Sequence, residues 1–413
     1  MKRMHKIFAL VLSFALLCSL PLAAHAQNSE GNILQFHNGS FKILILADLQ
    51  DTDTPQKETI ALMTAALDQT QPDLVVLLGD NIAGYWNGVD KEATERAVDA
   101  IAAPIDERGI PFALVFGNHD HEGLCSDEVG MTEEEAKEFL LACFQKYPTC
   151  LAIEGEELTG VGNYNLPILD SAGEKTAFNL WFMDSNPYTP DEEGGGYGYV
   201  HADQTAWYQR TSDALKAENG GEAVPSLLFQ HIIVPEVYDM LTETDKGTEG
   251  AKRGHSSFSD KYYVADNVYQ GAMREAPCPP DVNGGQFQSW VQQGDIIGAF
   301  FGHDHVNDFA GVYEGIHLVA TPACTFYSYG NHRGVRTVTL SESDLSTFQS
   351  DLLLYDELVG ERVWNLYKAQ HGYYEYRYRF LPIFGGVVGG LIVAAGAAAA
   401  IVHGVKKRKG KAK

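Results

Sequence analysis

Residues 41–50 read FKILILADLQ, a mostly apolar run that ends in residue types able to bind metal. Such a run, followed directly by polar residues, is typical of a buried strand. Residues 74–78 and 112–116 repeat the pattern farther along the chain. Between these runs, the spacing of apolar residues predicts helices over residues 58–69 and 91–107. Alternating strands and helices predict an α/β fold with a largely parallel sheet covered by helices.

The rest of the chain extends this alternation. We expect a helix over residues 132–144, because Thr132 followed by Glu135 matches a capping box. Later apolar runs predict strands at 179–183, 226–229, 296–301, 317–320 and 337–340. Residues 194–198 and 242–281 are rich in Gly, Pro and polar side chains. We expect them to be long surface loops that border a site.

Metal-binding residue types follow the strands directly. They are Asp48 and Gln50; Gly79-Asp80-Asn81; Gly117-Asn118-His119-Asp120-His121; His231; and Gly302-His303-Asp304-His305. Ligands in open α/β sheets bind beyond the carboxyl ends of the strands, so these residues are expected to converge. Alone, a Gly-Asp pair is usually a turn and His231 a hydrogen-bonded core histidine. Their joint occurrence predicts a centre for divalent metals, which carboxylate, amide and imidazole groups suit.

The ordered motifs Asp-x-Gln, Gly-Asp-Asn, Gly-Asn-His-Asp, His and Gly-His-x-His resemble those of the calcineurin-like metallophosphoesterase superfamily. The longer stretch over residues 302–309 resembles its purple-acid-phosphatase-like branch. The resemblance covers about residues 40 to 345. It implies a four-layer αββα sandwich, with two metal ions at the edge of the sheets.

The resemblance also implies a role for each matching residue. Asp48 and His305 would bind the first metal, and Asp80 would bridge both metals. The second metal would be held by Asn118, His231 and His303. His119 would stay off the metals and face the phosphate, oriented by Asp120.

Two positions depart from the family pattern. Gln50 stands where the first motif usually ends in His, and an amide oxygen is a weaker ligand than imidazole for Zn or Fe(II). A first site with Gln50 would be looser and more Mn- or Mg-like, or filled by water. Ala83 stands where purple enzymes place a tyrosinate ligand, so a tyrosinate–Fe(III) colour is not expected. The cofactors expected are two divalent ions, Mn, Fe, Zn or Mg.

The function implied is hydrolysis of phosphate monoesters, by attack of a hydroxide that bridges the two metals. A phosphodiesterase or a nucleotidase remains an alternative on the same site. A non-catalytic cell-surface binding protein is a second class, and retention of both His119 and the Gly-His-x-His pair argues against it. A structural calcium site is a third, but it would use oxygen ligands only.

Several loop residues are candidates for substrate contacts. His332 and Arg333 are candidates for gripping the phosphate, as are Arg253 and His255. For each of these, a solvated surface position is the alternative. Tyr197, Tyr199 and Trp207 follow a Gly-rich loop and are candidates for stacking on a nucleobase or aryl group. Core packing is the alternative for Trp207.

Charge restricts the class of partner. The 413 residues carry a formal net charge of -25, from 30 Lys and Arg against 55 Asp and Glu. Nine of the basic residues lie at the two ends, so the body between them is more acidic still, at about −34. Such a surface repels nucleic-acid backbones. We expect a phosphorylated small molecule as substrate and no nucleic-acid binding.

The two ends predict membrane targeting. A basic start, an apolar stretch over residues 7–22 and Ala24-His25-Ala26 make a secretory signal peptide over residues 1–26. The alternative is a retained anchor, for which the apolar core is short. Residues 380–402 carry no charged side chain and are long enough to cross ~30 Å of hydrocarbon.

We therefore expect a catalytic domain over residues 38–345, a connector over 346–379 and a membrane-spanning helix over 380–403. A basic cytoplasmic tail follows at 404–413, which places the domain outside the cytoplasm of a single-pass protein. A buried core helix or a sortase-type processing sequence is the alternative for the span. Five cysteines follow the signal peptide, and a disulfide between Cys143 and Cys150 would close a short loop.

Overall fold

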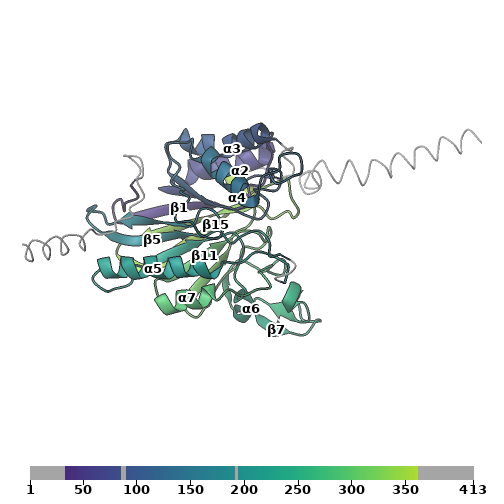
Figure 1. Ribbon diagram of the computed structural model, residues 1–413. Coiled ribbons are helices and arrows are strands. Elements are labelled where there is room, and N and C mark those ends of the chain that lie inside the picture. Colours follow the sequence, from purple (N-terminus) through teal and green to yellow (C-terminus); the bar gives the residue numbers. More distant parts are fainter. Residues whose placement is uncertain (1–32, 85–89, 191–193, 361–413) are drawn as a thin grey trace, which may run out of the picture. The chain divides into compact units, whose positions relative to one another are not determined.

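Two β-sheets organise the part of the chain that the computed structural model describes, residues 33–84, 90–190 and 194–360 (Figure 1). The first sheet has the strand order β15 (Asp344–Leu354), β14 (Gly334–Ser341), β1 (Ser40–Leu46), β2 (Leu74–Leu78) and β3 (Phe112–Val115). The second has the order β10 (Val268–Gln270), β12 (Ala310–Tyr313), β13 (Ile316–Ala320), β11 (Ile296–Phe301), β6 (Ser226–Phe229), β5 (Thr176–Phe182) and β4 (Tyr164–Leu169).

Helices cover the outer face of each sheet. Beside the first lie α2 (Lys57–Thr70), α3 (Lys91–Asp106) and α4 (Glu133–Phe144), and beside the second lie α5 (Ala202–Glu218) and α7 (Gln286–Gln293) (Figure 1). The expected α/β sandwich is therefore confirmed. A single largely parallel sheet is not what forms, because antiparallel strands border the parallel core of each sheet.

The central strands of both sheets run parallel, and this positions the polar residues that follow them. β1 pairs with β2 and β2 with β3, while β5 pairs with β6 and β6 with β11. Their apolar runs are buried, every residue of Leu74–Leu78 included. The carboxyl ends of each set therefore lie at one edge.

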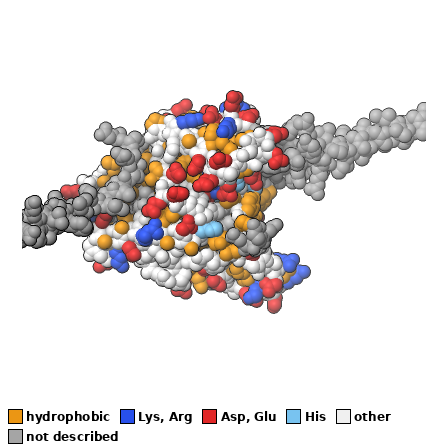
Figure 2. All heavy atoms as spheres, viewed as in Figure 1, with side chains coloured by type: hydrophobic (Ala, Val, Ile, Leu, Met, Phe, Trp, Pro, Cys, Tyr) orange, Lys and Arg blue, Asp and Glu red, His pale blue; other side chains and the backbone are white. Residues whose placement is uncertain are grey.

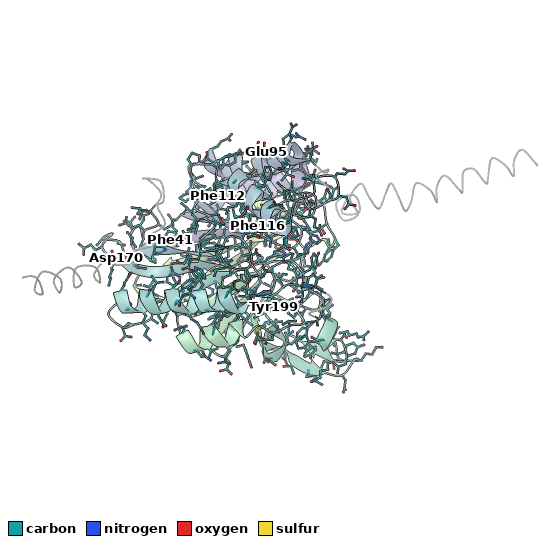
Figure 3. The ribbon with its side chains drawn as sticks, in the orientation of Figure 1. Phe41, Glu95, Phe112, Phe116, Asp170 and Tyr199 are labelled. Atoms are coloured by element: carbon teal, nitrogen blue, oxygen red, sulfur yellow. The ribbon has the colours of Figure 1, made fainter. Side chains whose placement is uncertain are left out.

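Apolar packing fills the space between the layers. One cluster joins the first sheet to α2, α3 and α4, and Phe41, Phe112 and Phe116, labelled in Figure 3, are buried in it. A second cluster joins the outer face of the second sheet to α5 and α7, around the buried Trp181 and Trp290. Trp207 packs edge-on against Trp181, so its core alternative is the correct one.

Local sequence accounts for the helix starts. The Asp90 side chain accepts a hydrogen bond from the Ala93 amide and begins α3. Thr132 and Glu135 form the expected capping box at the start of α4. The helix predicted over 132–144 is thus confirmed, with Thr132 as its cap.

The structure adds elements where the sequence predicted loop or connector. Within residues 242–281, β7 (Thr242–Thr244), β9 (Tyr262–Val264) and β8 (Lys252–Arg253) form a small sheet beside α6 (Val237–Met240). The first sheet also continues past residue 345, the predicted end of the domain, because β15 pairs with β14. After it, α8 (Tyr355–Val359) contacts α2 through a bond from Gln69 Nε2 to the Leu358 carbonyl. Between β6 and β15 the structure also has the 3-10 helix η3 (Ser256–Phe258).

The predicted signal peptide and membrane-spanning helix lie outside the described residues. Within those residues, no helix combines the length and apolar character needed to cross a membrane. All five cysteines of this part of the chain are free. Cys143 and Cys150, whose pairing the sequence left open, are thus not joined, and both side chains pack in the first apolar cluster.

Candidate metal centre

The five predicted motifs meet at the carboxyl ends of the central strands. The Asp48 amide donates to the Gly79 carbonyl, and the Gly302 amide donates to the His231 carbonyl. Between motifs, the His119 amide donates to Asp80 Oδ1 at 2.8 Å. The His303 amide contacts both Asp48 carboxylate oxygens, at 3.1 and 3.2 Å, which links the two sheets.

Carboxylates and imidazoles crowd together in this buried cluster. His231 Nε2 lies 3.4 Å from Asp80 Oδ2 and 4.0 Å from Asp48 Oδ1. His305 Nε2 lies 3.4 Å from Asp48 Oδ1, and the rings of His231 and His303 are 5.3 Å apart. One ligand atom each from Asp48, Asp80 and His231 lies within 4.8 Å of the others, a spacing suited to a shared cation.

Several buried atoms of the cluster that could bind a metal have no hydrogen-bond partner. They are Gln50 Oε1, Asn118 Oδ1 and His231 Nε2. A buried polar atom without a hydrogen-bond partner lowers the stability of a fold by about 1–3 kcal/mol. Such atoms are therefore expected where a bound ligand or ion interacts with them. All three are metal-ligating atom types, and the residues present therefore fit the predicted metal pair.

The amide nitrogens of two of these residues explain how their side chains are oriented. Gln50 Nε2 donates to Asp80 Oδ2 at 3.3 Å, which leaves Oε1 unpaired. Asn118 Nδ2 donates to the Tyr188 hydroxyl at 3.0 Å, which leaves its Oδ1 unpaired. Gln50, the departure from the family pattern, therefore lies within the centre.

The backbone is strained where it turns the ligands inward. Asp48, Gln50, Asp80 and His303 all have positive φ, between 30° and 69°. Non-glycine residues adopt this region infrequently, and strained positions gather at functional sites. A Cβ atom added at Gly117 would collide with the Asp80 carboxylate, so the close approach of these turns requires glycine.

Electrostatics couple the buried groups. Burial opposes the charged form of His231, but the Asp80 and Asp48 carboxylates outweigh it and raise its pKa to about 10. Burial likewise opposes ionised Asp80, yet His231 and His119 hold its pKa below the usual value. Burial above all holds the pKa of His303 well below its usual range.

His119 stands apart from the ligands. Its side chain is 38% exposed, and its Nδ1 lies 2.8 Å from Glu122 Oε2. Burial lowers the pKa of His119, but Glu122 and Asp80 outweigh it and raise the value to about 9.

The predicted partner of His119, Asp120, has another function. Its buried carboxylate accepts hydrogen bonds from the backbone amides of Gly117, Asn81 and Ile82. Asp120 thus ties the second motif to the third, and the expectation that it orients His119 is corrected. Three residues after His119, the turn places Glu122 in that role.

Two of the four candidate phosphate contacts, His332 and Arg333, bind other groups of the protein. His332 Nε2 lies 2.7 Å from Asp308 Oδ2. Arg333 is 4% exposed, and its guanidinium donates to backbone carbonyls of the turn at residues 328–332. This correction follows from burial, which a loop position in the sequence does not reveal. Burial also lowers the pKa of Arg333 to about 10.

Two tyrosines that the sequence did not indicate border the centre. Tyr188 accepts the hydrogen bond from Asn118, and the Tyr329 ring stacks on His305 at 4.5 Å between centroids. Neither belongs to a motif, and no local pattern in the sequence marks them. Tyr197, a predicted stacking residue, packs edge-on against His303 at 4.3 Å, whereas Tyr199 stacks on His201.

A family comparison identifies the kind of protein to which the chain is similar. The family described as Calcineurin-like phosphoesterase matches residues 41–307. The chain is 29% identical over 372 residues to "Probable inactive purple acid phosphatase 29" of Arabidopsis thaliana, covering 82% of this chain and 85% of the plant protein. It is 26% identical over 317 residues to "Phosphatase DCR2" of Saccharomyces cerevisiae, covering 72% of this chain and 49% of the yeast protein.

Among solved structures, a dimetal phosphatase of Danio rerio aligns with a TM-score of 0.42 and 14% identity, over 76% of this chain and 99% of the fish protein. The family match covers more than half of the chain and includes the motifs that build the centre through Asn307. From this match, the chain belongs to the calcineurin-like phosphoesterase family, and the proteins it is similar to include a purple acid phosphatase-like plant protein.

Proposed function

We propose that this protein is a metal-dependent phosphohydrolase that cleaves phosphate monoesters. The observation that carries the proposal is the set of buried ligand atoms around Asp80 that lack a hydrogen-bond partner, beside a histidine that lies outside the set. A scaffold that only binds metal has no need of the separate histidine. The preference for monoesters over diesters follows the purple acid phosphatase-like relatives.

The ligand atoms divide into two groups around Asp80. Asp48, Gln50 and His305 would hold the first cation, and Asn118, His231 and His303 the second. A pair of divalent cations supplies charge neutralisation for the phosphoryl oxygens and lowers the pKa of water. The cations would also offset the negative charge of the surface; Figure 2 shows Asp and Glu side chains gathered on the face in view.

His119 would act on the phosphoryl group. Its exposure lets the ring reach a bound ester, and the Glu122 carboxylate fixes Nδ1 and favours the protonated ring. The remaining nitrogen, Nε2, would then donate a hydrogen bond to a phosphoryl oxygen or a proton to the leaving oxygen. Glu122 orients the ring, a role carried by a carboxylate in many acid–base pairs.

Hydrolysis of 4-nitrophenyl phosphate by the full-length chain, supplied with Mn, Fe, Zn or Mg after metal removal, tests the proposal. We expect turnover, and His119→Ala should lower it about 10²–10⁴-fold while the metal content stays unchanged. Glu122→Gln should lower it less, and His37→Ala, at an exposed position, should leave it unchanged.

Bis(4-nitrophenyl) phosphate, assayed in parallel, separates diesterase from monoesterase activity. No turnover of either ester with any of the four metals would overturn the proposal. It would favour instead a non-catalytic protein, as the word "inactive" in the plant relative's name suggests for that protein.

We extend the proposal to location: a single-pass protein with its phosphoesterase domain outside the cytoplasm. This rests on the sequence of residues 1–26 and 380–413 alone. Protease added to intact cells should degrade the domain and spare a tag placed after Lys413. A protected domain would contradict this topology.

A further inference from the structure

The hydroxyl of Tyr188 contacts a predicted metal ligand. It accepts the hydrogen bond from Asn118 Nδ2 at 3.0 Å, and Asn118 is 1% exposed. An asparagine side chain ends in one oxygen and one NH₂ group, and a cation binds it through the oxygen. When Asn118 Oδ1 faces a cation, Nδ2 therefore needs an acceptor inside the protein, and the Tyr188 hydroxyl supplies it.

Neighbouring contacts hold the Tyr188 hydroxyl in place. The Gly198 amide donates to the Pro187 carbonyl at 3.1 Å, which fixes the backbone directly before the tyrosine. The Tyr188 ring stacks on the Tyr197 ring, with 6.1 Å between their centroids. A hydroxyl that is fixed in this way restricts the orientation of the Asn118 side chain before any ligand binds, as a preorganised metal site requires.

A buried ion pair anchors the start of the loop that carries Tyr188. Lys137 Nζ lies 2.7 Å from Asp184 Oδ2, and Asp184 Oδ1 accepts from the Asn186 amide at 2.9 Å. Asn186 has a φ of 59°, and its Nδ2 donates to the Tyr199 carbonyl at 2.8 Å. Two residues farther on, Tyr188 is 46% exposed. Its position is therefore set by polar contacts of the loop, because burial of its own ring is incomplete.

We propose that Tyr188 is a positioning residue for the second cation: its hydroxyl keeps Asn118 Oδ1 turned toward the place where that cation binds. The inference rests on the metal-binding part of the proposed function and not on hydrolysis. Partners that hydrogen-bond to metal ligands orient them, and loss of such a partner weakens metal binding about 10–100-fold. On the side of the first cation, Gln50 Nε2 donates to Asp80 instead, so Tyr188 serves one of the two positions.

Tyr188→Phe removes the hydroxyl, keeps the ring and tests the inference without any need for turnover. Equilibrium dialysis of the metal-free full-length chain against increasing Mn²⁺ counts the bound ions and gives the affinity of each. We expect two ions in the unaltered chain. In Tyr188→Phe, one ion should bind about 10- to 100-fold more weakly and the other should bind as before. The unchanged ion also shows that the variant has folded.

Two further variants assign the effect to the orientation of Asn118. A carboxylate presents an oxygen in either orientation, so Asn118→Asp needs no hydroxyl to turn it. Adding Tyr188→Phe to Asn118→Asp should therefore change the metal affinity by less than about threefold. Tyr269→Phe is the matched control, because Tyr269 is an exposed tyrosine whose hydroxyl lies 2.8 Å from His317 Nδ1. It should bind both ions as the unaltered chain does.

Unchanged affinity for both ions in Tyr188→Phe would overturn the inference, and so would fewer than two ions in the unaltered chain. An equal loss of both ions would also overturn it, since Tyr188 would then support the fold alone. So would an undiminished effect of Tyr188→Phe in the Asn118→Asp chain. The proposed function fails separately: selective loss of one ion without ester hydrolysis by the unaltered chain would keep this inference and remove the hydrolase. Hydrolysis with metal affinities that do not depend on Tyr188 would do the reverse.

Discussion

Asp80→Asn should remove both metal ions and nearly all phosphoesterase activity. Asp80 lies at the middle of the cluster, contacted by His231, Gln50 and the His119 amide. Asparagine keeps the size of the side chain and an oxygen for the amide bond, but it loses the negative charge that two cations would share. Loss of an outer-sphere partner alone weakens metal binding 10–100-fold, so loss of this carboxylate should cost about 100-fold or more.

Metal content after equilibration with Mn²⁺, followed by gel filtration, measures the effect. The matched control is Asp295→Asn, since Asp295 is also a buried carboxylate but accepts from the Tyr208 and Ser212 hydroxyls. The control should retain both ions. If Asp80→Asn kept its metal, the bridging assignment would be wrong; loss of one ion alone would make Asp80 a ligand of a single cation.

Lys137→Met should lower the free energy of unfolding by about 3–5 kcal/mol, a large loss for a single substitution. Lys137 Nζ on α4 lies 2.7 Å from Asp184 Oδ2 beyond β5, and each side chain is 1% exposed. Methionine fills the same space but leaves the Asp184 carboxylate without its cation. The amides of Val161 and Asn186 still donate to Asp184, which offsets only part of the cost.

Urea unfolding measures this difference, with Lys146→Met as the control on the same side of the fold. Lys146 pairs with Glu95 at 3.0 Å, but its side chain is 54% exposed. An exposed pair contributes about 0–1 kcal/mol, so the control should be nearly neutral. Similar losses in the two variants would show that burial does not set the energy of the Lys137 pair.

The residues that follow the strands are what made the candidate metal centre predictable from sequence. Each motif follows an apolar run, and parallel pairing brings the ends of such runs to one edge. Asp48, Asp80, His231 and His305 are therefore close in space although they are far apart in the chain. The apolar runs predicted the same central strands, because burial on both faces leaves a continuous signature in sequence.

Side-chain partners within loops were not predictable in the same way. Asp120 follows His119 directly, but the turn directs the Asp120 carboxylate to backbone amides. The His119 ring contacts the Glu122 carboxylate instead. Arg333 is a positively charged residue in a loop, which suggested a phosphate contact, yet it is buried and its guanidinium supports a turn. Such roles depend on which way a loop residue points, which residue spacing does not encode.

Border strands and partners distant in sequence were missed for a related reason. The solvent-facing half of β15 is polar, so the strand has no long apolar run. Tyr188 meets Asn118 across 70 positions of sequence, and only the packing of the two sheets brings them together.

The central claim is that these loops form a centre for two cations around Asp80. Anomalous diffraction from crystals of the protein grown with Mn²⁺ tests it most directly. We expect two manganese peaks about 3.5–4 Å apart, with an Asp80 oxygen between them and with Gln50 and Asn118 oxygens as ligands. A single peak, or peaks only at surface carboxylates, would contradict the claim.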